Sequence, residues 1–237
     1  MKFLYLAVNL ASVIIPLIFS FHPKLNFNKK FRFALPAILL TAVIFILWDF
    51  RFTALGVWGF NDKYITGLRI INLPVEEVMF FICIPFACLF TYYSLNRLYR
   101  FRLPDPVARI TVLILSLILL ATGFLFRDQR YTAYTFFSTA ILLLAITFVR
   151  KAEWMGNFLV AYLILLIPFL IVNGILTGTG PAEPVVWYNN RENMDVRILT
   201  IPVEDFIYGL EMILLNVFFY EWFNRGRLRP AGDPRIR

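Results

Sequence analysis

A nine-residue segment occurs twice in this chain, and each copy begins a long apolar run. Arg69–Glu77 (RIINLPVEE) is repeated 128 positions later as Arg197–Asp205 (RILTIPVED). Over 69–97, nine of the 29 positions are identical to their counterparts at 197–225. An apolar bias produces chance matches between apolar residues, but not between Arg, Pro, Glu and an Asn-Arg pair. The repetition therefore predicts a duplicated membrane module with acid pairs at equivalent places.

The apolar content of the chain is too high for one soluble core. Of 237 residues, 60% are hydrophobic, and the mean hydropathy is +0.72. Crossing a hydrocarbon layer of about 30 Å takes roughly 20 apolar residues in a helix. Because the apolar runs are continuous rather than alternating, we expect helices and not strands. Seven stretches qualify: 3–21, 33–49, 75–95, 107–126, 131–149, 157–177 and 203–223.

The predicted fold is an all-α polytopic bundle of seven transmembrane helices, organised as two repeats. At the offset of 128, the first stretch aligns with the fifth and the second with the sixth. We expect three-helix modules at 1–100 and 130–225, a joining helix within 101–129 and a basic tail at 226–237. With one joiner between modules of three spans, both modules have the same orientation, as in a parallel repeat. No small-residue cleavage pattern follows the first stretch, so we expect it to be retained.

Basic residues are concentrated on one predicted side of the membrane. The positive-inside rule places that side in the cytoplasm, with the N-terminus outside and the C-terminus inside. We expect an inner-membrane location in a bacterial cell and basic residues that meet lipid headgroups rather than nucleic acid. This side holds 15 of the 23 basic residues: Lys24, Lys29, Lys30, Arg32, Arg97, Arg100, Arg102, Arg109, Arg150, Lys151, Arg225, Arg227, Arg229, Arg235 and Arg237.

Each acid pair follows a long connection rich in aromatic and polar residues. The first connection carries Trp58, Asn61, Asp62, Tyr64 and Arg69, and the second carries Trp187, Tyr188, Asn189, Arg191, Asp195 and Arg197. Pro74 and Pro202 suit a helix start, where acids lie beside the positive end of the helix dipole. Ordinary helix-start chemistry alone would account for the acids. The arginines moderate the charge of the acids, hold the loop or form plain surface ion pairs.

Two further features point beyond helix-start chemistry. Each acid pair is followed by an aromatic residue, Phe80 or Tyr208, on the same helical face. Glu211 lies two turns beyond Glu204, where an acid is costly in lipid and is expected to face a protein interior. Burial of that kind favours the protonated form of a carboxyl group and leaves it a proton to donate. The counterpart of Glu211 in the first module is Cys83, so the two modules are expected to differ in role.

Acids that hold a proton, aromatic faces and apolar walls together suit one kind of chemistry. They can protonate an alkene and stabilise the resulting carbocation, because aromatic ring faces attract cations. Excluding water also matters, since a carbocation that meets water becomes an alcohol. The less specific interpretation is that these aromatics belong to the membrane belt or to the core.

Seven predicted spans, the duplicated Pro-Val-Glu-Glu and Pro-Val-Glu-Asp, and the aromatic connections resemble the membrane lycopene cyclases of the heterodimeric bacterial and fused fungal or archaeal type. The resemblance covers nearly the whole chain. It implies cyclisation of the linear ψ ends of lycopene to β-ionone rings, with the lipid bilayer as solvent. We also expect association with other carotenoid-pathway enzymes or with a second copy.

The resemblance implies catalytic roles for Glu76, Glu77, Glu204 and Asp205, and we expect Glu76 and Glu204 to be the most informative. Glu211 is a further catalytic candidate because of its depth in the helix. Substrate-binding residues are expected to be Trp58, Tyr64, Phe80, Trp187, Tyr208, Arg69 and Arg197. Because the chain has no G-x-G-x-x-G, we expect no cofactor. Asp49 and Asp62 align with Thr177 and Asn190 at offset 128, so the duplication does not support them as site residues.

Other functions stay open to different degrees. A proton-coupled transporter would also use paired carboxylates. A membrane prenyltransferase would need Asp-rich motifs for Mg²⁺, and Asn61-Asp62 begins such a motif without completing it. A retinal protein would need a Lys in the last span, and 203–223 has none. His22 with two distant cysteines predicts no metal site.

Overall fold

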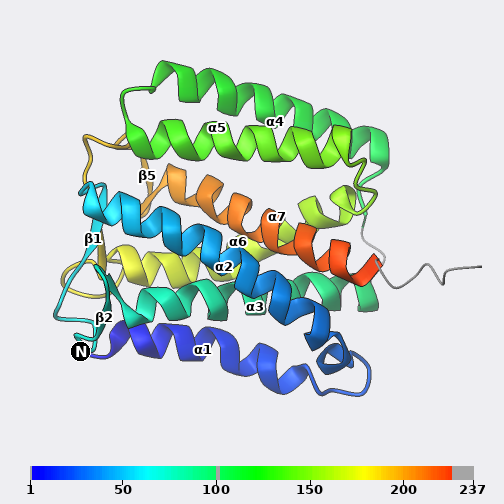
Figure 1. Cartoon of the computed structure of the whole chain (residues 1–237), viewed down its shortest axis with the longest axis horizontal. Coiled ribbons are helices and arrows are strands. Elements are labelled where there is room, and N and C mark those ends of the chain that lie inside the picture. The colour runs from blue at the N-terminus through cyan, green and yellow to red at the C-terminus, as the bar shows by residue number, and fades with distance from the viewer. Residues whose placement is uncertain (1, 100–101, 226–237) are drawn as a thin grey trace, which may run out of the picture.

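The computed structural model describes residues 2–99 and 102–225, so the tail predicted at 226–237 lies outside the described residues. Helices run side by side along the bundle, and short strands gather at one end (Figure 1). The helices are α1 (Leu4–Phe19), α2 (Phe31–Ala54), α3 (Val75–Leu98), α4 (Asp105–Leu125), α5 (Arg130–Leu144), α6 (Met155–Thr177) and α7 (Val203–Arg225).

Six helical segments of the described chain are long and apolar enough to cross a membrane. A 3₁₀ turn, Phe27–Lys30, precedes α2, and a π-helical turn, Ala145–Val149, continues α5, so that these spans contain 28 and 20 residues. In contrast, α1 has 16 residues, or about 24 Å at about 1.5 Å per residue. The prediction of an all-α membrane bundle is confirmed, with six full-length spans and α1 as a shorter apolar helix.

The buried and exposed faces of the helices fit this setting. Leu89, Leu143, Phe158 and Leu214, from four different helices, are each at most 1% exposed and form part of the central core. Large apolar side chains cover the outer surface, as at Leu163, which is 62% exposed. A bundle that is apolar both inside and outside is suited to lipid rather than water.

In the part of the chain that the structure describes, six short strands form three antiparallel pairs at one end of the bundle. Each module has a hairpin just before its acid pair: β2 (Arg69–Ile70) pairs with β3 (Leu73–Pro74), and β5 (Arg197–Ile198) pairs with β6 (Ile201–Pro202). The helix after each hairpin begins at Val75 or Val203, one residue after the proline. The acid pairs therefore lie in the first turns of α3 and α7.

The third strand pair joins the two modules. β1 (Trp58–Phe60) pairs with β4 (Val186–Tyr188), and Trp58 lies opposite Tyr188 while Phe60 lies opposite Val186. Trp58 and Val186 are 128 positions apart, as are Phe60 and Tyr188, so exchanging the modules maps this ladder onto itself. Such a self-complementary contact is typical of a two-fold axis. Here the axis relates two modules whose helices run in the same direction, as in a parallel repeat.

The offset between the modules is 128 from β1 onward, but it changes in the earlier helices. The Val57 amide donates to the Phe52 carbonyl, and the Val185 amide donates to the Leu176 carbonyl. Because Val57 and Val185 are 128 apart, α2 and α6 are related by an offset of 124. The expected alignment of the second and sixth helices at 128 is therefore four residues out of register. The longer connection after α6, 178–185 against 55–57 after α2, absorbs the difference.

The first helix of each module, α1 or α5, also departs from the constant offset of 128. The Tyr5 amide donates to the carbonyl of Tyr64, and the Tyr131 amide donates to the carbonyl of Glu192. Tyr64 and Glu192 are 128 apart, so Tyr5 corresponds to Tyr131 at an offset of 126. These two corrected registers decide which residues of the two modules are counterparts.

Candidate active site in the bundle

The first acid of each pair binds the loop that precedes its helix. Glu76 Oε1 accepts a hydrogen bond from the Thr66 amide at 2.6 Å. Its counterpart, Glu204 Oε1, accepts one from the Met194 amide at 2.8 Å and another from Thr132 Oγ1 at 2.6 Å. Both glutamates are completely buried. Their position fixes the connection to the helix start, as a side-chain cap does.

The two arginines also hold the loops. Arg69 Nη1 donates to the Asn72 carbonyl at 3.1 Å, and its Nη2 pairs with Asp62 at 2.6 Å. In the second module, Arg197 donates in the same way to the Thr200 carbonyl and to Asn190 Oδ1. Of the roles expected for the arginines, the contacts agree with holding the loop, and Arg69 also forms a surface ion pair with Asp62. Asp62 and Asn190 are therefore equivalent loop partners at the surface.

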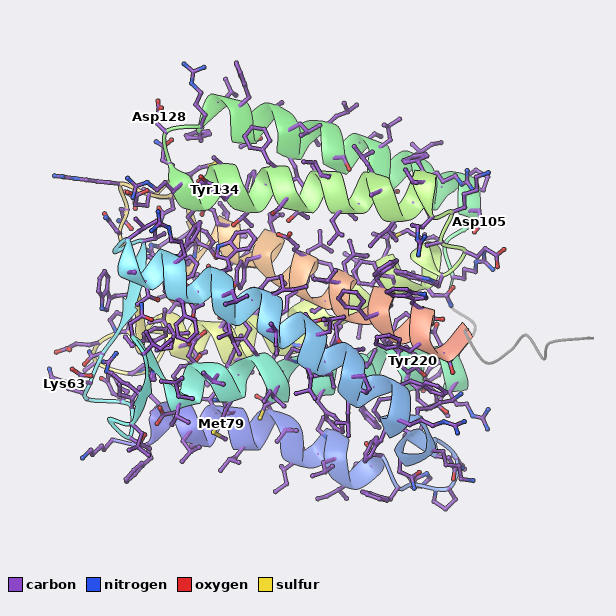
Figure 2. The ribbon with its side chains drawn as sticks, viewed as in Figure 1. Lys63, Met79, Asp105, Asp128, Tyr134 and Tyr220 are labelled. Atoms are coloured by element: carbon purple, nitrogen blue, oxygen red, sulfur yellow. The ribbon has the colours of Figure 1, made fainter. Side chains whose placement is uncertain are left out.

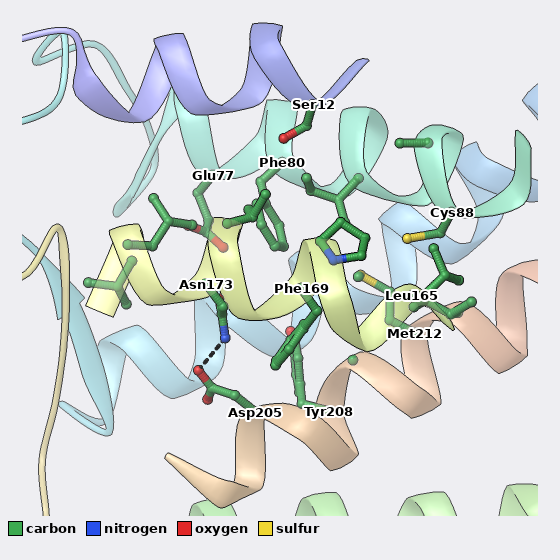
Figure 3. A pocket seen from close by; sticks show the side chains of 18 of the residues that line it. Ser12, Glu77, Phe80, Cys88, Leu165, Phe169, Asn173, Asp205, Tyr208 and Met212 are labelled. Carbon is green, nitrogen blue, oxygen red and sulfur yellow. Dashed lines mark hydrogen bonds between the residues drawn. The ribbon is translucent and has the colours of Figure 1, made fainter. Parts of the chain in front are cut away.

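A cavity of about 240 Å³ lies deeper in the bundle, beside the strand end. Most of its walls come from α1, α3, α6 and α7 (Figure 3), with Asp49 from α2 and Tyr131 from α5, and β1 and β4 close one end. Most of its lining is apolar, whereas its acids come from three helices. Those acids are Asp49, Glu77 and Asp205, so the second acid of each pair faces the cavity. Glu76 and Glu204 are not among the lining residues.

Glu77 and Asp205 differ in how many donors surround them. Glu77 Oε2 accepts a hydrogen bond from the Tyr5 hydroxyl at 2.5 Å. Asp205 accepts three: Tyr131 donates to Oδ1 at 2.6 Å, while Tyr188 and Asn173 donate to Oδ2, each at 2.8 Å (Figure 3). Tyr5 and Tyr131 are counterparts in the corrected register. Each module thus supplies a tyrosine to the second acid of its pair.

Tyr188 remains a hydrogen-bond donor over a wide pH range. Burial, followed by the negative charge of Asp205, raises the pKa of its phenol well above the usual value. Since the phenol stays protonated, it donates to Asp205 rather than repelling it. Hydrogen bonds of this kind stabilise the charged form of a carboxylate.

Asp49 lies in the cavity although a constant offset of 128 argued against it. The Trp58 indole N–H donates a hydrogen bond to Asp49 Oδ1. At the observed offset of 124, the counterpart of Asp49 is Asn173 rather than Thr177, and both Asp49 and Asn173 line the cavity. The duplication therefore supports Asp49 once the longer connection after α6 is allowed for.

Aromatic rings cover the acid end of the cavity. The rings of Tyr131 and Tyr188 stack with centroids 5.9 Å apart, and Trp58 lies 5.0 Å from Tyr131. Tyr208 completes the group, with its centroid 6.1 Å from that of Trp58 and 6.2 Å from that of Tyr131. Phe80 lines the cavity below Glu77. The predicted substrate-binding residues Trp58, Phe80 and Tyr208 thus all line the cavity.

Other predicted site residues lie outside this cavity. Glu211 is buried, as expected, but it faces α5, where Ser138 and Thr139 donate to its Oε2 at 2.8 and 3.0 Å. Trp187 is 44% exposed and packs over Gly59, where an added Cβ would lie 2.3 Å from the indole ring. Tyr64 contacts the opposite loop, accepting a hydrogen bond from the Glu183 amide. These residues and the two arginines support the loops and helices around the site.

Tyr5, Tyr131 and Asn173 were not identified from the sequence. Tyr5 and Tyr131 stand near the starts of two aligned apolar stretches, and an alignment that allowed an offset of 126 would have paired them. Asn173 would have been paired with Asp49 at an offset of 124. In the described part of the chain, no group of three or more His, Cys, Asp or Glu side chains is arranged to hold a metal ion.

Comparison with known proteins adds a family to this geometry. A family model described as lycopene cyclase matches residues 2–95 and 128–223, which together make up most of the chain. No curated protein and no solved structure gives a match. The two matched regions each contain one of the acid pairs; the first contains Tyr5, and the second contains Tyr131 and Tyr188, which bind the cavity acids. The chain therefore belongs to the lycopene cyclase family, in its two-module form, and is a membrane enzyme of carotenoid cyclisation.

Proposed function

We propose that the protein is a lycopene β-cyclase that isomerises linear ψ end groups by acid catalysis in the cavity between α1, α3, α6 and α7. A proton is added to C2 of the terminal C1=C2 bond, which leaves a cation at C1. The C5=C6 bond then attacks C1 and closes the six-membered ring. Loss of the proton at C6 forms the new C5=C6 double bond of the β ring. One proton enters and one leaves, so the reaction is redox-neutral.

The different hydrogen-bond environments of the two cavity acids support different roles. Three donors surround Asp205 and stabilise its carboxylate form. Among the described residues, Glu77 receives a single hydrogen bond, from Tyr5, in an apolar setting that favours a neutral carboxylic acid. We assign proton donation to Glu77. Asp205 stabilises the cation and accepts the C6 proton.

The aromatic wall suits a positively charged intermediate. Trp58, Tyr131, Tyr188 and Tyr208 present their rings at the acid end of the cavity. The negative face of an aromatic ring attracts a cation by about 0.5–2 kcal/mol, and by more where water is excluded. Apolar walls also keep water away from the C1 cation, which would otherwise be trapped as an alcohol.

The cavity also has the shape of a polyene site. Glu77 and Thr91 both line it, and they stand about 21 Å apart along α3 at about 1.5 Å per residue. Tyr162 and Leu176 mark a similar length along α6. A narrow apolar slot with acids at one end can hold an end group at the acids and the conjugated chain along the helices.

One observation carries the proposal: the second acid of each repeated pair faces a single apolar, aromatic-walled cavity. The test is to express the wild-type chain and the Glu77→Gln and Asp205→Asn variants in cells that accumulate lycopene. Wild-type cells should form cyclic carotenoids, detected by chromatography and absorption, and both variants should form little or none. Glu183→Gln, on the exposed loop, is the matched control and should retain activity. Unchanged lycopene in wild-type cells, or full activity in both cavity variants, would refute the proposal.

A further inference from the structure

The acid end of the cavity is built from matching positions of the two modules. Glu77 and Asp205 both line it, as do their companions Phe80 and Tyr208. Tyr5 and Tyr131 also correspond and also line it. This end therefore lies close to the two-fold axis that passes through the β1–β4 ladder.

Away from the acids, the cavity leaves the axis and continues on one side only. It follows α1 at Ser12 and Pro16, and α6 at Leu165 and Phe169. The corresponding helices of the other module are α5 and α2. Their counterpart positions, such as Ser138 on α5, are not among the lining residues. Symmetry thus predicts two slots, one beside α1 and α6 and a second beside α5 and α2, and the cavity occupies the first.

Side-chain size explains why the second slot is filled. Four lining positions of the open slot have a larger counterpart in the other module at the registers given above, whereas Ser12 and Phe169 have counterparts of the same residue type and Tyr162 and Leu165 have smaller ones. The four pairs are Gly209 and Phe81, Val172 and Trp48, Ala87 and Leu215, and Thr91 and Phe219. In all four cases the smaller residue stands on the cavity side.

Two of the larger residues, Phe81 and Trp48, pack into an aromatic cluster with Phe45 and Tyr208. Phe81 and Phe45 are each 1% exposed, and their ring centroids are 6.1 Å apart. Phe45 lies 5.0 Å from Tyr208, and Trp48 lies 5.7 Å from the same ring. Tyr208 therefore has the filled region on one side and the cavity on the other. In Figure 3 it points from α7 into the pocket, beside Phe169.

We infer that the polyene chain of the substrate occupies only the slot beside α1 and α6, and that Gly209, Val172, Ala87 and Thr91 determine its path. This inference rests on the proposed cyclase function. With one slot and one set of acids, the chain cyclises one end group in each binding event. A substrate with two linear ends has to leave and bind again in the reverse direction before its second ring is formed.

The inference is tested by replacing a small residue that lines the open slot with the larger residue found at the corresponding position of the filled slot. Val172→Trp copies Trp48 into the cavity, and the neighbouring Ile171→Trp is the matched control, because Ile171 is 62% exposed on the outer face of α6. We expect Val172→Trp to lower cyclisation at least tenfold and Ile171→Trp to leave it unchanged. Thr91→Phe, compared with Ile82→Phe on the outer face of α3, repeats the test at the far end of the slot.

A binding measurement separates this inference from the proposed function. The Asp205→Asn variant, purified from lycopene-accumulating cells, should carry unconverted lycopene, and adding Val172→Trp to it should remove most of that pigment. Adding Ile171→Trp instead should not. If Val172→Trp retains both pigment binding and cyclisation while Asp205→Asn is inactive, the slot assignment is overturned and the proposed function stands. If Asp205→Asn cyclises normally while Val172→Trp loses pigment, the slot stands and the assigned chemistry fails.

A pulse–chase experiment tests the one-end consequence. Labelled lycopene is bound to the wild-type protein in lipid vesicles, and an excess of unlabelled lycopene is then added. Release after the first ring predicts that labelled monocyclic product accumulates. Labelled bicyclic product that forms at an unchanged rate despite the chase would overturn the inference.

Discussion

The adjacent acids Glu204 and Asp205 offer a sharp test of the site, because one binds the loop and the other faces the cavity. In Asp205→Asn, Oδ1 can still accept the Tyr131 hydrogen bond, but an amide replaces the oxygen that accepts from Tyr188 and Asn173. The variant loses its charge beside the developing cation and its ability to take the C6 proton. Loss of general acid–base catalysis typically costs 10²–10⁴ in rate, or about 3–5 kcal/mol in the barrier.

Glu204→Gln should affect stability instead. Its Oε1 can keep the hydrogen bonds from Met194 and Thr132, whereas the new amide group replaces Oε2, a buried atom without a hydrogen-bond partner. Burying an unsatisfied donor costs about 1–3 kcal/mol. We expect a lower thermal unfolding midpoint in detergent, with turnover per folded molecule close to wild type.

The assay measures cyclic product per folded protein, with folded protein quantified by size-exclusion chromatography after solubilisation. Per folded molecule, Asp205→Asn should form at least a hundredfold less product, whereas Glu204→Gln should stay close to wild type. Equal losses of turnover in the two variants would contradict the distinction between a loop-binding and a cavity acid. So would a fully active Asp205→Asn.

Three further predictions follow from other contacts. Tyr131→Phe removes one of the three donors to Asp205. A hydrogen bond to a charged group contributes about 1.5–3 kcal/mol, so turnover should fall at least tenfold in the same pigment assay. Tyr134→Phe, at a lipid-facing position, is the control and should leave turnover unchanged. Ile71 has a φ of 58°, a left-handed conformation that strains a β-branched residue, and its side chain is 82% exposed. Asn tolerates this conformation, so Ile71→Asn should raise the free energy of unfolding by about 1 kcal/mol. An unchanged unfolding midpoint would refute this backbone strain. The hydrogen bond from Lys63 lowers the pKa of Glu183, so this contact stabilises the fold at neutral pH. Its contribution is lost as the pH falls through that lowered pKa. Lys63→Met should therefore make the free energy of unfolding fall less steeply with decreasing pH, without changing cyclisation.

Much of the fold could be predicted because lipid restricts the chain so strongly. Continuous apolar runs require helices, and the duplicated hairpin and acid pair fixed the starts of α3 and α7 to within a residue. The repeat also predicted equivalent loop contacts, and the bonds made by Arg69 and Arg197 follow it. These features depend on local sequence and on residues that differ from the apolar background.

Which acid of each pair faces the cavity was not predictable in the same way. Neighbouring residues on a helix point about 100° apart, so Glu76 and Glu77 face different surroundings, and only the packing of α1 and α6 decides which one meets the cavity. Tyr5 and Asn173 stand in apolar stretches far along the chain from the acids they concern. Matching them to their counterparts Tyr131 and Asp49 requires sequence offsets of 126 and 124 instead of 128. These offsets reflect connection lengths rather than any local motif.

The second slot can be filled by larger side chains, while the first stays open, because both modules belong to one chain. In an assembly of two identical subunits, a phenylalanine at the position of Phe81 would also stand at the position of Gly209, and both slots would close together. Once α4 links the copies covalently, a substitution in one half leaves the other half unchanged. Fusion thus allows a bundle with a two-fold axis to keep paired acids on that axis while giving its substrate a single direction of approach.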